Sequence, residues 1–244
     1  MAETQVAKGK PADYGQLIVK RRFRLTKAAL PLQDKKILDF GCGNGAQTIE
    51  FVDEKCNITA IDINPHALAV FDAYIKNHEI SNITTRKYDG SKLPFPDAHF
   101  DAVISYEVLE HVQDEHESLA EIYRVLKPKG EIVLSVPNKG WIFETHGARL
   151  PVLPWNRVPF FSWLPHAIHG RFAKARIYRK KDIRQVLERN KFSVRDTHYI
   201  TAPMDVIKSP RIQRFLRRHI FKNDSTRSSI LATALLVHAR KIDY

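Results

Sequence analysis

A short apolar run that ends in three closely spaced glycines is the feature that most constrains the fold of this chain. Residues 37–45 read ILDFGCGNG, with Gly41, Gly43 and Gly45 in the expected turn. Glycine lets a backbone turn tightly and approach a ligand without an intervening Cβ. We expect a helical stretch from about Asn44 to Asp53, whose first N–H groups would face the ligand. The run therefore predicts a strand, a ligand-binding turn and a helix.

The same alternation of strands and helices repeats over the first 137 residues. Asn64 and Pro65, for example, supply an N-cap and a first-turn proline for a helix that runs to about Asn77. Short connections between alternating elements predict a parallel sheet with helices on both faces, which binds ligands at the carboxyl ends of its strands. The expected strands are 37–40, 57–62, 83–88, 99–106 and 131–137, and the other expected helices are 14–30 and one from about Glu110 to Lys127.

The pattern changes at Asn138 to an irregular stretch rich in proline and aromatic residues, including Trp141, Trp155 and Trp163. A long irregular segment with this much apolar character is typical of an ordered lid. Beyond it, helices at 180–190 and 209–221 and strands at 192–202 and 229–239 would complete a doubly wound, mostly parallel seven-stranded α/β sheet. The predicted division is an N-terminal helical segment (1–34), a ligand-binding core (35–137), a substrate cap (138–180) and a C-terminal completion of the sheet (181–244).

Acidic residues stand at the ends of three expected neighbouring strands. Asp39 ends the first strand, Asp62 ends the second, and Asp89 ends the third, directly before Gly90. Asp62 follows the glycine turn at the distance at which a carboxylate binds a ribose diol in nucleotide-binding folds. Three carboxylates at adjacent strand ends are a more specific signal than one, and they indicate a ligand that contains a nucleoside.

With these motifs, residues 35–137 resemble the class I S-adenosylmethionine-dependent methyltransferases, in the broad group that methylates small molecules, quinones and sugars. The resemblance implies a Rossmann-like core, S-adenosylmethionine as cofactor and methyl transfer as the reaction. It also implies that Asp39 and the glycine turn hold the methionine end, that Asp62 binds the ribose, and that Ile63 lies against the adenine. The full set of cofactor-binding residues expected from it is Asp39, Gly41, Cys42, Gly43, Gly45, Asp62, Ile63, Asp89, Gly90, Ser105 and Tyr106.

Two other functions stay open at this point. Gly41, Gly43 and Ala46 also fit the G-x-G-x-x-A pattern of a nicotinamide dehydrogenase, with Asp62 as the ribose acid. Against that function, Asp39 would face the pyrophosphate, whereas a carboxylate suits a cofactor that carries an amine and a sulfonium. The second alternative is a protein that binds S-adenosylmethionine or its demethylated product without catalysis.

A sulfonium methyl is already activated, so the enzyme mainly aligns the acceptor and excludes water. A hydroxyl acceptor would also benefit from a general base. His111 is the first candidate, His146 and Tyr178 in the cap are further candidates, and Tyr106 is expected to line the pocket with Glu107. His111 would otherwise only orient the start of a helix. No metal is expected, because the histidine pairs lack acidic partners at a recognisable ligand spacing.

Basic charge is concentrated in the C-terminal part of the chain. Residues 138–244 hold 22 lysines and arginines against 7 acids, whereas residues 1–137 hold 17 against 20. Within it, the segment 211–222 forms a basic amphipathic pattern with Ile212, Phe215, Leu216 and His219 on one face. This pattern predicts either a helix that docks on an anionic membrane surface or one whose apolar face packs on the sheet or cap.

The remaining expectations concern the acceptor and the compartment. Only two cysteines occur, and no apolar run is long enough to cross a bilayer, so we expect a cytoplasmic protein with peripheral membrane contact as an option. The expected acceptor is a small, hydrophobic, lipid-linked or anionic molecule that is methylated on oxygen or carbon. Nucleic acid is not the expected partner, because Ser105 to Val108 replace the motif of base amino-group methylases and no RNA-binding module is recognised.

Overall fold

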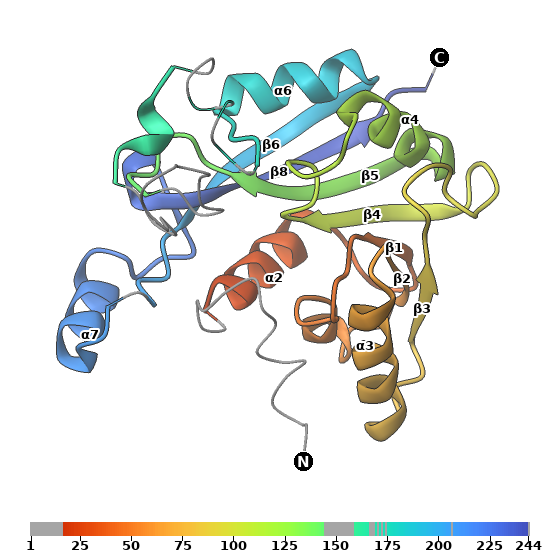
Figure 1. Ribbon diagram of the computed structural model, residues 1–244. Coiled ribbons are helices and arrows are strands. Elements are labelled where there is room, and N and C mark those ends of the chain that lie inside the picture. The colour runs from red at the N-terminus through yellow and green to blue at the C-terminus, as the bar shows by residue number, and fades with distance from the viewer. Residues whose placement is uncertain are drawn as a thin grey trace.

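The computed structural model describes residues 17–143, 159–165, 169, 171, 173, 175–205 and 207–243. Its centre is one sheet in the strand order β3-β2-β1-β4-β5-β8-β6-β7, in which the first five strands are parallel and β8 is antiparallel to both neighbours (Figure 1). The strands are β1 Lys36–Phe40, β2 Asn57–Asp62, β3 Ile83–Lys87, β4 Phe100–Tyr106, β5 Leu126–Pro137, β6 Phe192–Thr201, β7 Ser225–Thr226 and β8 Ala232–Lys241.

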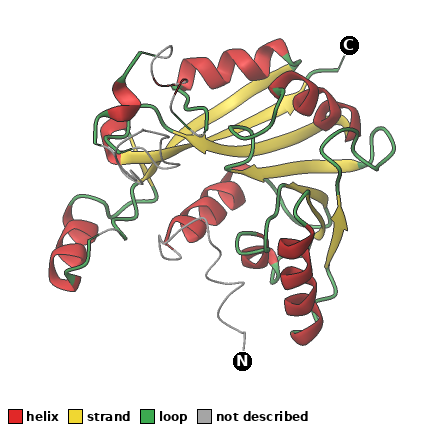
Figure 2. Ribbon diagram, in the orientation of Figure 1, coloured by secondary structure: helices red, strands yellow, loops and turns green. Residues whose placement is uncertain are grey.

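Helices cover both faces of the sheet, as Figure 2 shows. One apolar cluster packs α4 and α6 on the first face, and a second packs α2 and α3 on the other. The helices are α2 Leu17–Ala29, α3 Pro65–Asn77, α4 Glu115–Val125, α6 Lys180–Arg189 and α7 Pro210–His219, with 3₁₀ turns η1 Thr48–Phe51, η2 Phe161–Trp163 and η3 Ser229–Leu231. The predicted doubly wound α/β architecture is confirmed.

The central strands read as continuous apolar runs because both of their faces are buried. In β4, Val103 belongs to the cluster under α4 and α6, whereas Ala102 and Ile104 belong to the cluster under α2 and α3. This two-sided burial places β1 and β4 in the middle of the molecule. Their carboxyl ends therefore open at the same edge of the sheet.

The starts of two helices depend on side-chain caps. Asn64 accepts hydrogen bonds from the backbone N–H groups of His66 and Ala67, with Pro65 in the first turn, so the predicted start of α3 is confirmed. The prediction that a helix begins near Glu110 is wrong. Asp114 caps α4 instead, and the chain from β4 to this cap is a turn that begins at Glu107 with a left-handed φ of 57°.

Two further predictions differ from the structure. The helix expected over 44–53 is reduced to η1, because Gly43 and Gly45 have positive φ angles of 55° and 80° and hold the chain outside the helical region. The sheet has eight strands rather than seven, because β7 adds two residues to the free edge of β6. The predicted seventh strand is β8.

The segment predicted as a cap, 138–180, is described in part. Its first residues leave β5 and bridge back to Tyr178, and Trp141 joins Phe221, Ala202 and Met204 in a third apolar cluster. Trp155 and the candidate base His146 lie outside the described residues. Within the described part of the chain, none of the helices combines the length and the apolar character needed to cross a bilayer.

Candidate functional site

In the glycine turn after β1, protein side chains pack against two of the glycines, and the space beside the third is open. A Cβ on Gly41 would lie 2.3 Å from a methyl group of Val108, and a Cβ on Gly45 would lie 2.2 Å from the ring of Phe71. A Cβ on Gly43 would meet nothing within 4 Å. The turn therefore rests on protein at Gly41 and Gly45 and presents Gly43 to a ligand.

Asp39 lies beneath this turn at the end of β1. Its side chain is only 2% exposed, and it accepts a hydrogen bond of 2.6 Å from the hydroxyl of Thr48 in η1. Burial raises the pKa of Asp39 to about 7, and the nearby Asp62 carboxylate adds to the rise. A positively charged group near Asp39 would favour its ionised form, as expected for a cofactor that carries an amine and a sulfonium.

Asp62 connects the end of β2 to the glycine turn. One oxygen accepts a hydrogen bond of 2.7 Å from Gly43 N–H, and the other accepts one of 2.8 Å from Asn64 N–H. A carboxylate oxygen has more than one acceptor position, so both oxygens keep capacity for the hydroxyls of a ribose. The neighbouring Ile63 is 62% exposed, and a Cβ on Gly90 would lie 3.9 Å from it. The ends of β2 and β3 thus form one surface beside the turn.

Asp89 stands on that surface after β3. Its Oδ1 accepts hydrogen bonds from the backbone N–H (2.9 Å) and the hydroxyl (2.7 Å) of Ser91. These two bonds lower the pKa of Asp89, so it is a carboxylate at neutral pH. The carboxylate is suited to accept a hydrogen bond from an amine such as that of adenine.

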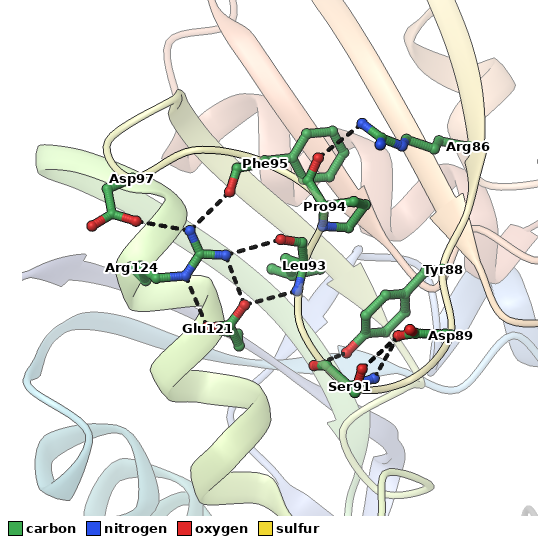
Figure 3. A network of polar contacts seen from close by, with 10 residues as sticks. All are labelled: Arg86, Tyr88, Asp89, Ser91, Leu93, Pro94, Phe95, Asp97, Glu121 and Arg124. Atoms are coloured by element: carbon green, nitrogen blue, oxygen red, sulfur yellow. Dashed lines mark hydrogen bonds and ion pairs between the residues drawn. The ribbon is translucent and has the colours of Figure 1, made fainter.

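The loop that follows Asp89 is anchored to α4 by a network that the sequence analysis missed (Figure 3). Glu121 accepts a hydrogen bond of 2.7 Å from Leu93 N–H, and Arg124 donates to the carbonyl oxygens of Leu93 and Phe95 at 2.9 and 2.8 Å. The two side chains also pair with each other at 2.7 Å. The i, i+3 spacing of Glu121 and Arg124 on a helix was a signal for their pairing, but not for their contact with a distant loop.

The end of β4 forms the middle of this edge. Ser105 donates a hydrogen bond of 3.0 Å to the carbonyl oxygen of Phe40, which ties β4 to β1. The hydroxyl of Tyr106 is 2.8 Å from Thr26 Oγ1 in α2, and burial raises the pKa of this phenol. Tyr106 is therefore neutral at physiological pH and fills space between the sheet and α2.

A cleft of about 450 Å³ opens beyond β4, between the turn that precedes α4 and the chain that leads into α6. It contains two of the predicted catalytic residues, the exposed His111 and the buried Tyr178. Tyr178 donates a hydrogen bond to Glu115, and burial together with this carboxylate raises its pKa. The lining residues are Glu110, His111, Val112, Glu115, His169, Ala173, Ala175, Arg176, Ile177, Tyr178, Asp182 and Val186.

A pair of glutamates, Glu107 and Glu110, lies between the carboxyl end of β4 and this cleft. Glu107 accepts a hydrogen bond of 2.6 Å from Ser135 and pairs with Arg22 of α2 at 2.8 Å. Glu110 is 2% exposed, and burial and the Glu107 carboxylate raise its pKa well above the ordinary value. The sequence predicted Glu107 in the pocket but not Glu110, because a helix was expected to begin at Glu110. Among the described residues, no three His, Cys, Asp or Glu side chains are grouped so as to hold a metal ion.

Comparison with known proteins decides the family of this site. Residues 38–134 match the family model described as "Methyltransferase domain". The core is a class I methyltransferase domain. The chain is 35% identical over 104 residues to a ubiquinone/menaquinone biosynthesis C-methyltransferase of Psychromonas ingrahamii, covering 41% of each chain. It is 29% identical over 160 residues to a ubiquinone biosynthesis O-methyltransferase of Pseudomonas aeruginosa, covering 62% of this chain and 68% of the relative.

Solved structures show the same fold. An S-adenosylmethionine-dependent methyltransferase from Aquifex aeolicus superposes with a TM-score of 0.61 at 15% identity, covering 93% of both chains. The [4+2]-cyclase SpnF superposes with a TM-score of 0.63 at 17% identity, covering 93% of this chain and 81% of the cyclase. This chain therefore shares its fold with proteins of different named activities.

The family implies S-adenosylmethionine as the cofactor. The residues at the carboxyl ends of β1, β2, β3 and β4, which we call the cofactor edge, fit it. The open front of Gly43 and the buried Asp39 suit the methionine end, and Asp62 and Ile63 suit the nucleoside. This result favours the methyltransferase over the nicotinamide dehydrogenase alternative. The chain spans 41% of the length of the Psychromonas relative, so its acceptor does not follow from that comparison.

Proposed function

We propose that this protein transfers the methyl group of S-adenosylmethionine to a small, hydrophobic or lipid-linked acceptor, on oxygen or carbon. One observation carries the proposal: the cofactor edge and the cleft are contiguous at the end of β4. Gly41 packs on Val108, and Glu110 and His111, two and three residues after Val108, line the cleft. An acceptor in the cleft would therefore lie beside the methionine end of the cofactor.

The cofactor supplies an activated methyl group when bound. The residues of the chain hold its charged end and orient its nucleoside. Burial raises the pKa of the Asp39 carboxyl to about 7. A positive charge beside it stabilises the ionised carboxylate, so Asp39 favours binding of the cationic methionine end. Asp62 and Asp89 fix the nucleoside at the ends of β2 and β3, and this positioning sets the line of attack.

The glutamate pair is suited to receive the proton of an acceptor hydroxyl. Arg22 favours the ionised form of Glu107, and the raised pKa of Glu110 keeps that group protonated, so the pair carries one negative charge. The acceptor proton passes to Glu110 while the proton of Glu110 moves to Glu107. His111, the base predicted from the sequence, lines the same cleft and stays a second candidate for this role. The neutral phenol of Tyr178 is suited to hydrogen bonding rather than to proton abstraction.

The names of the relatives support a quinone-like acceptor. Both the C-methyltransferase of Psychromonas ingrahamii and the O-methyltransferase of Pseudomonas aeruginosa are named for quinone biosynthesis. Quinol precursors combine an electron-rich ring with an apolar tail, which agrees with the aromatic composition of the cap. Peripheral contact with an anionic membrane would suit such an acceptor, because a molecule with an apolar tail resides in a bilayer.

Calorimetric titration with S-adenosylmethionine, its demethylated product and NAD tests the cofactor. We expect binding of the first two, abolished by Asp62→Ala and retained by the matched control Asp53→Ala, whose side chain is exposed. Incubation with methyl-labelled cofactor and either a lipid extract or an aqueous metabolite extract then tests the acceptor. Label in a lipid product supports the proposal, whereas label only in aqueous products contradicts the lipid-linked acceptor. Binding without turnover in either extract favours a cofactor-binding protein without catalysis.

A further inference from the structure

The helix α7 turns two of its apolar side chains, Ile212 and Phe215, outward. None of its ten residues is buried, and Ile212 and Phe215 are 55% and 59% exposed. Figure 1 shows α7 standing apart from the sheet on connecting loops. A helix that completed the core would show the opposite arrangement, with its apolar stripe covered.

The inner face of α7 is held mainly by polar contacts. Gln213 donates a hydrogen bond of 3.1 Å to the carbonyl oxygen of Met204. Arg217 donates to the carbonyl oxygen of Pro203 at 2.8 Å and pairs with Asp205. Leu216 is the apolar side chain that packs inward, against the third cluster. These contacts orient the helix, so the exposure of Ile212 and Phe215 is a consequence of the fold rather than of a loose end.

Positive charge surrounds the outward apolar pair. Arg211, Arg214 and Arg218 are all exposed, and they flank Ile212 and Phe215 on the outer face. The charge continues past the helix, where Ile220 lines a polar cleft together with Lys180 and Arg227. Apolar side chains bordered by arginines are typical of a helix that lies in the interface of an anionic bilayer.

A second exposed apolar group lies at the 3₁₀ turn η2. Phe160 and Trp163 are 53% and 48% exposed. Their rings contact each other edge to face, with the ring centroids 5.1 Å apart. The backbone N–H of Phe160 donates a hydrogen bond to the carbonyl oxygen of Ile142, and the indole N–H of Trp163 donates one to the carbonyl oxygen of Gly140. Ile142 packs against the same third cluster as Leu216. Tryptophan and phenylalanine that are half exposed fit the boundary between head groups and acyl chains. These hydrogen bonds tie the group to residues 140–142, which follow the carboxyl end of β5.

We propose that the outer face of α7, together with Phe160 and Trp163, docks the protein on an anionic phospholipid surface. Docking there brings the membrane to the edge of the sheet at which β5 ends and the cap begins. A lipid-linked acceptor would then reach the cleft without leaving the bilayer completely; this last step rests on the proposed function, whereas the docking itself does not. A bilayer suits the face better than a second copy of the chain, since two such faces would bring their arginines together.

Vesicle sedimentation at low salt tests the docking. The full-length protein is mixed with vesicles of phosphatidylcholine alone or of phosphatidylcholine and phosphatidylglycerol in a 7:3 ratio, with no acceptor present. We expect binding to the anionic vesicles that weakens as salt is added. Each arginine near an anionic surface strengthens binding roughly fivefold, so Arg211→Gln/Arg218→Gln should weaken it by roughly 25-fold. Ile212→Ser/Phe215→Ser should weaken it by roughly tenfold or more, because both side chains lose their burial among the acyl chains.

Matched variants on a remote surface provide the controls. Lys55→Gln/Lys76→Gln removes the same charge from exposed positions, and Val70→Ser shortens an exposed apolar side chain on α3. These controls should bind the vesicles as the wild type does. Circular dichroism and S-adenosylmethionine titration on every variant verify that the fold and the cofactor edge are intact.

Three results of the sedimentation experiment would overturn the docking proposal. They are absence of wild-type binding to the anionic vesicles, equal loss in the α7 variants and the controls, and equal binding to neutral and anionic vesicles. Dimers of the wild type that dissociate in the α7 variants would also overturn it, because a second copy would then cover the face. Vesicle binding without methyl transfer would leave the docking intact and contradict only the proposed reaction.

Discussion

The packing of the glycine turn leads to a prediction that separates its structural from its ligand-binding glycines. In Gly41→Ala, the new methyl group would lie 2.3 Å from Val108, and the residue would keep a φ of 83°. A left-handed φ costs a residue with a Cβ about 1–2 kcal/mol, and overpacking of a filled site costs about 1–3 kcal/mol more. We therefore expect Gly41→Ala to lower the free energy of unfolding by about 2–5 kcal/mol.

Gly43→Ala is the matched comparison, because its Cβ would meet no protein atom within 4 Å. Only the cost of the left-handed φ, about 1–2 kcal/mol, applies to this variant. Its methyl group would instead stand where we place the methionine end of the cofactor. Gly43→Ala should therefore lose only about 1–2 kcal/mol of stability but bind S-adenosylmethionine at least tenfold more weakly.

Urea unfolding without cofactor measures the stability difference, and calorimetric titration measures the affinity. Adding Val108→Ala to Gly41→Ala supplies an internal test, because it removes the clashing methyl groups but leaves the φ angle unchanged. The double variant should regain part of the stability lost by Gly41→Ala. Equal losses of stability in Gly41→Ala and Gly43→Ala would refute the packing argument. Unchanged cofactor affinity in Gly43→Ala would refute the assignment of the open side of the turn.

Three further predictions concern the carboxylates and the anchored loop. Because burial raises the pKa of Asp39 to about 7, its contribution is most favourable below its ordinary pKa of 3.8 and is lost as the pH rises through 7. In urea unfolding without cofactor, the stability of wild type relative to Asp39→Asn should therefore fall between about pH 4 and pH 7; a constant difference would contradict the shift. Arg124→Ala should lower stability by about 2–4 kcal/mol and weaken S-adenosylmethionine binding by releasing the loop after Asp89, whereas Lys92→Ala should change neither. Glu110→Gln should lower kcat about 100-fold or more with unchanged cofactor affinity, and a kcat equal to that of wild type would remove the glutamate pair from the reaction.

The order of the core elements was predictable because buried parallel strands leave a simple pattern in the sequence. The apolar runs at 37–40 and 57–62 became β1 and β2 with Asp39 and Asp62 at their ends. The start of α3 was predictable for a local reason, the capping by Asn64. The start of α4 was not, because the sequence pattern around Glu110 favours a helix, but Glu110 is buried beside Glu107 in the turn before α4. The assignments of cofactor-binding and catalytic residues, and the division into segments, stay predictions that the experiments above address.

By itself, the sequence determined the strand-turn-helix repeat, the glycine turn and the acidic residues at the strand ends, because each depends on neighbours within a few residues. The tertiary structure alone decided which distant groups meet. Arg22 of α2 reaches Glu107 after β4, and Arg124 of α4 reaches the loop after β3. The same holds for α7: its amphipathic pattern was plain in the sequence, but either face could have turned inward. Gln213 and Arg217 decided the direction by binding the chain at 203–205, and their bonds leave Ile212 and Phe215 facing outward.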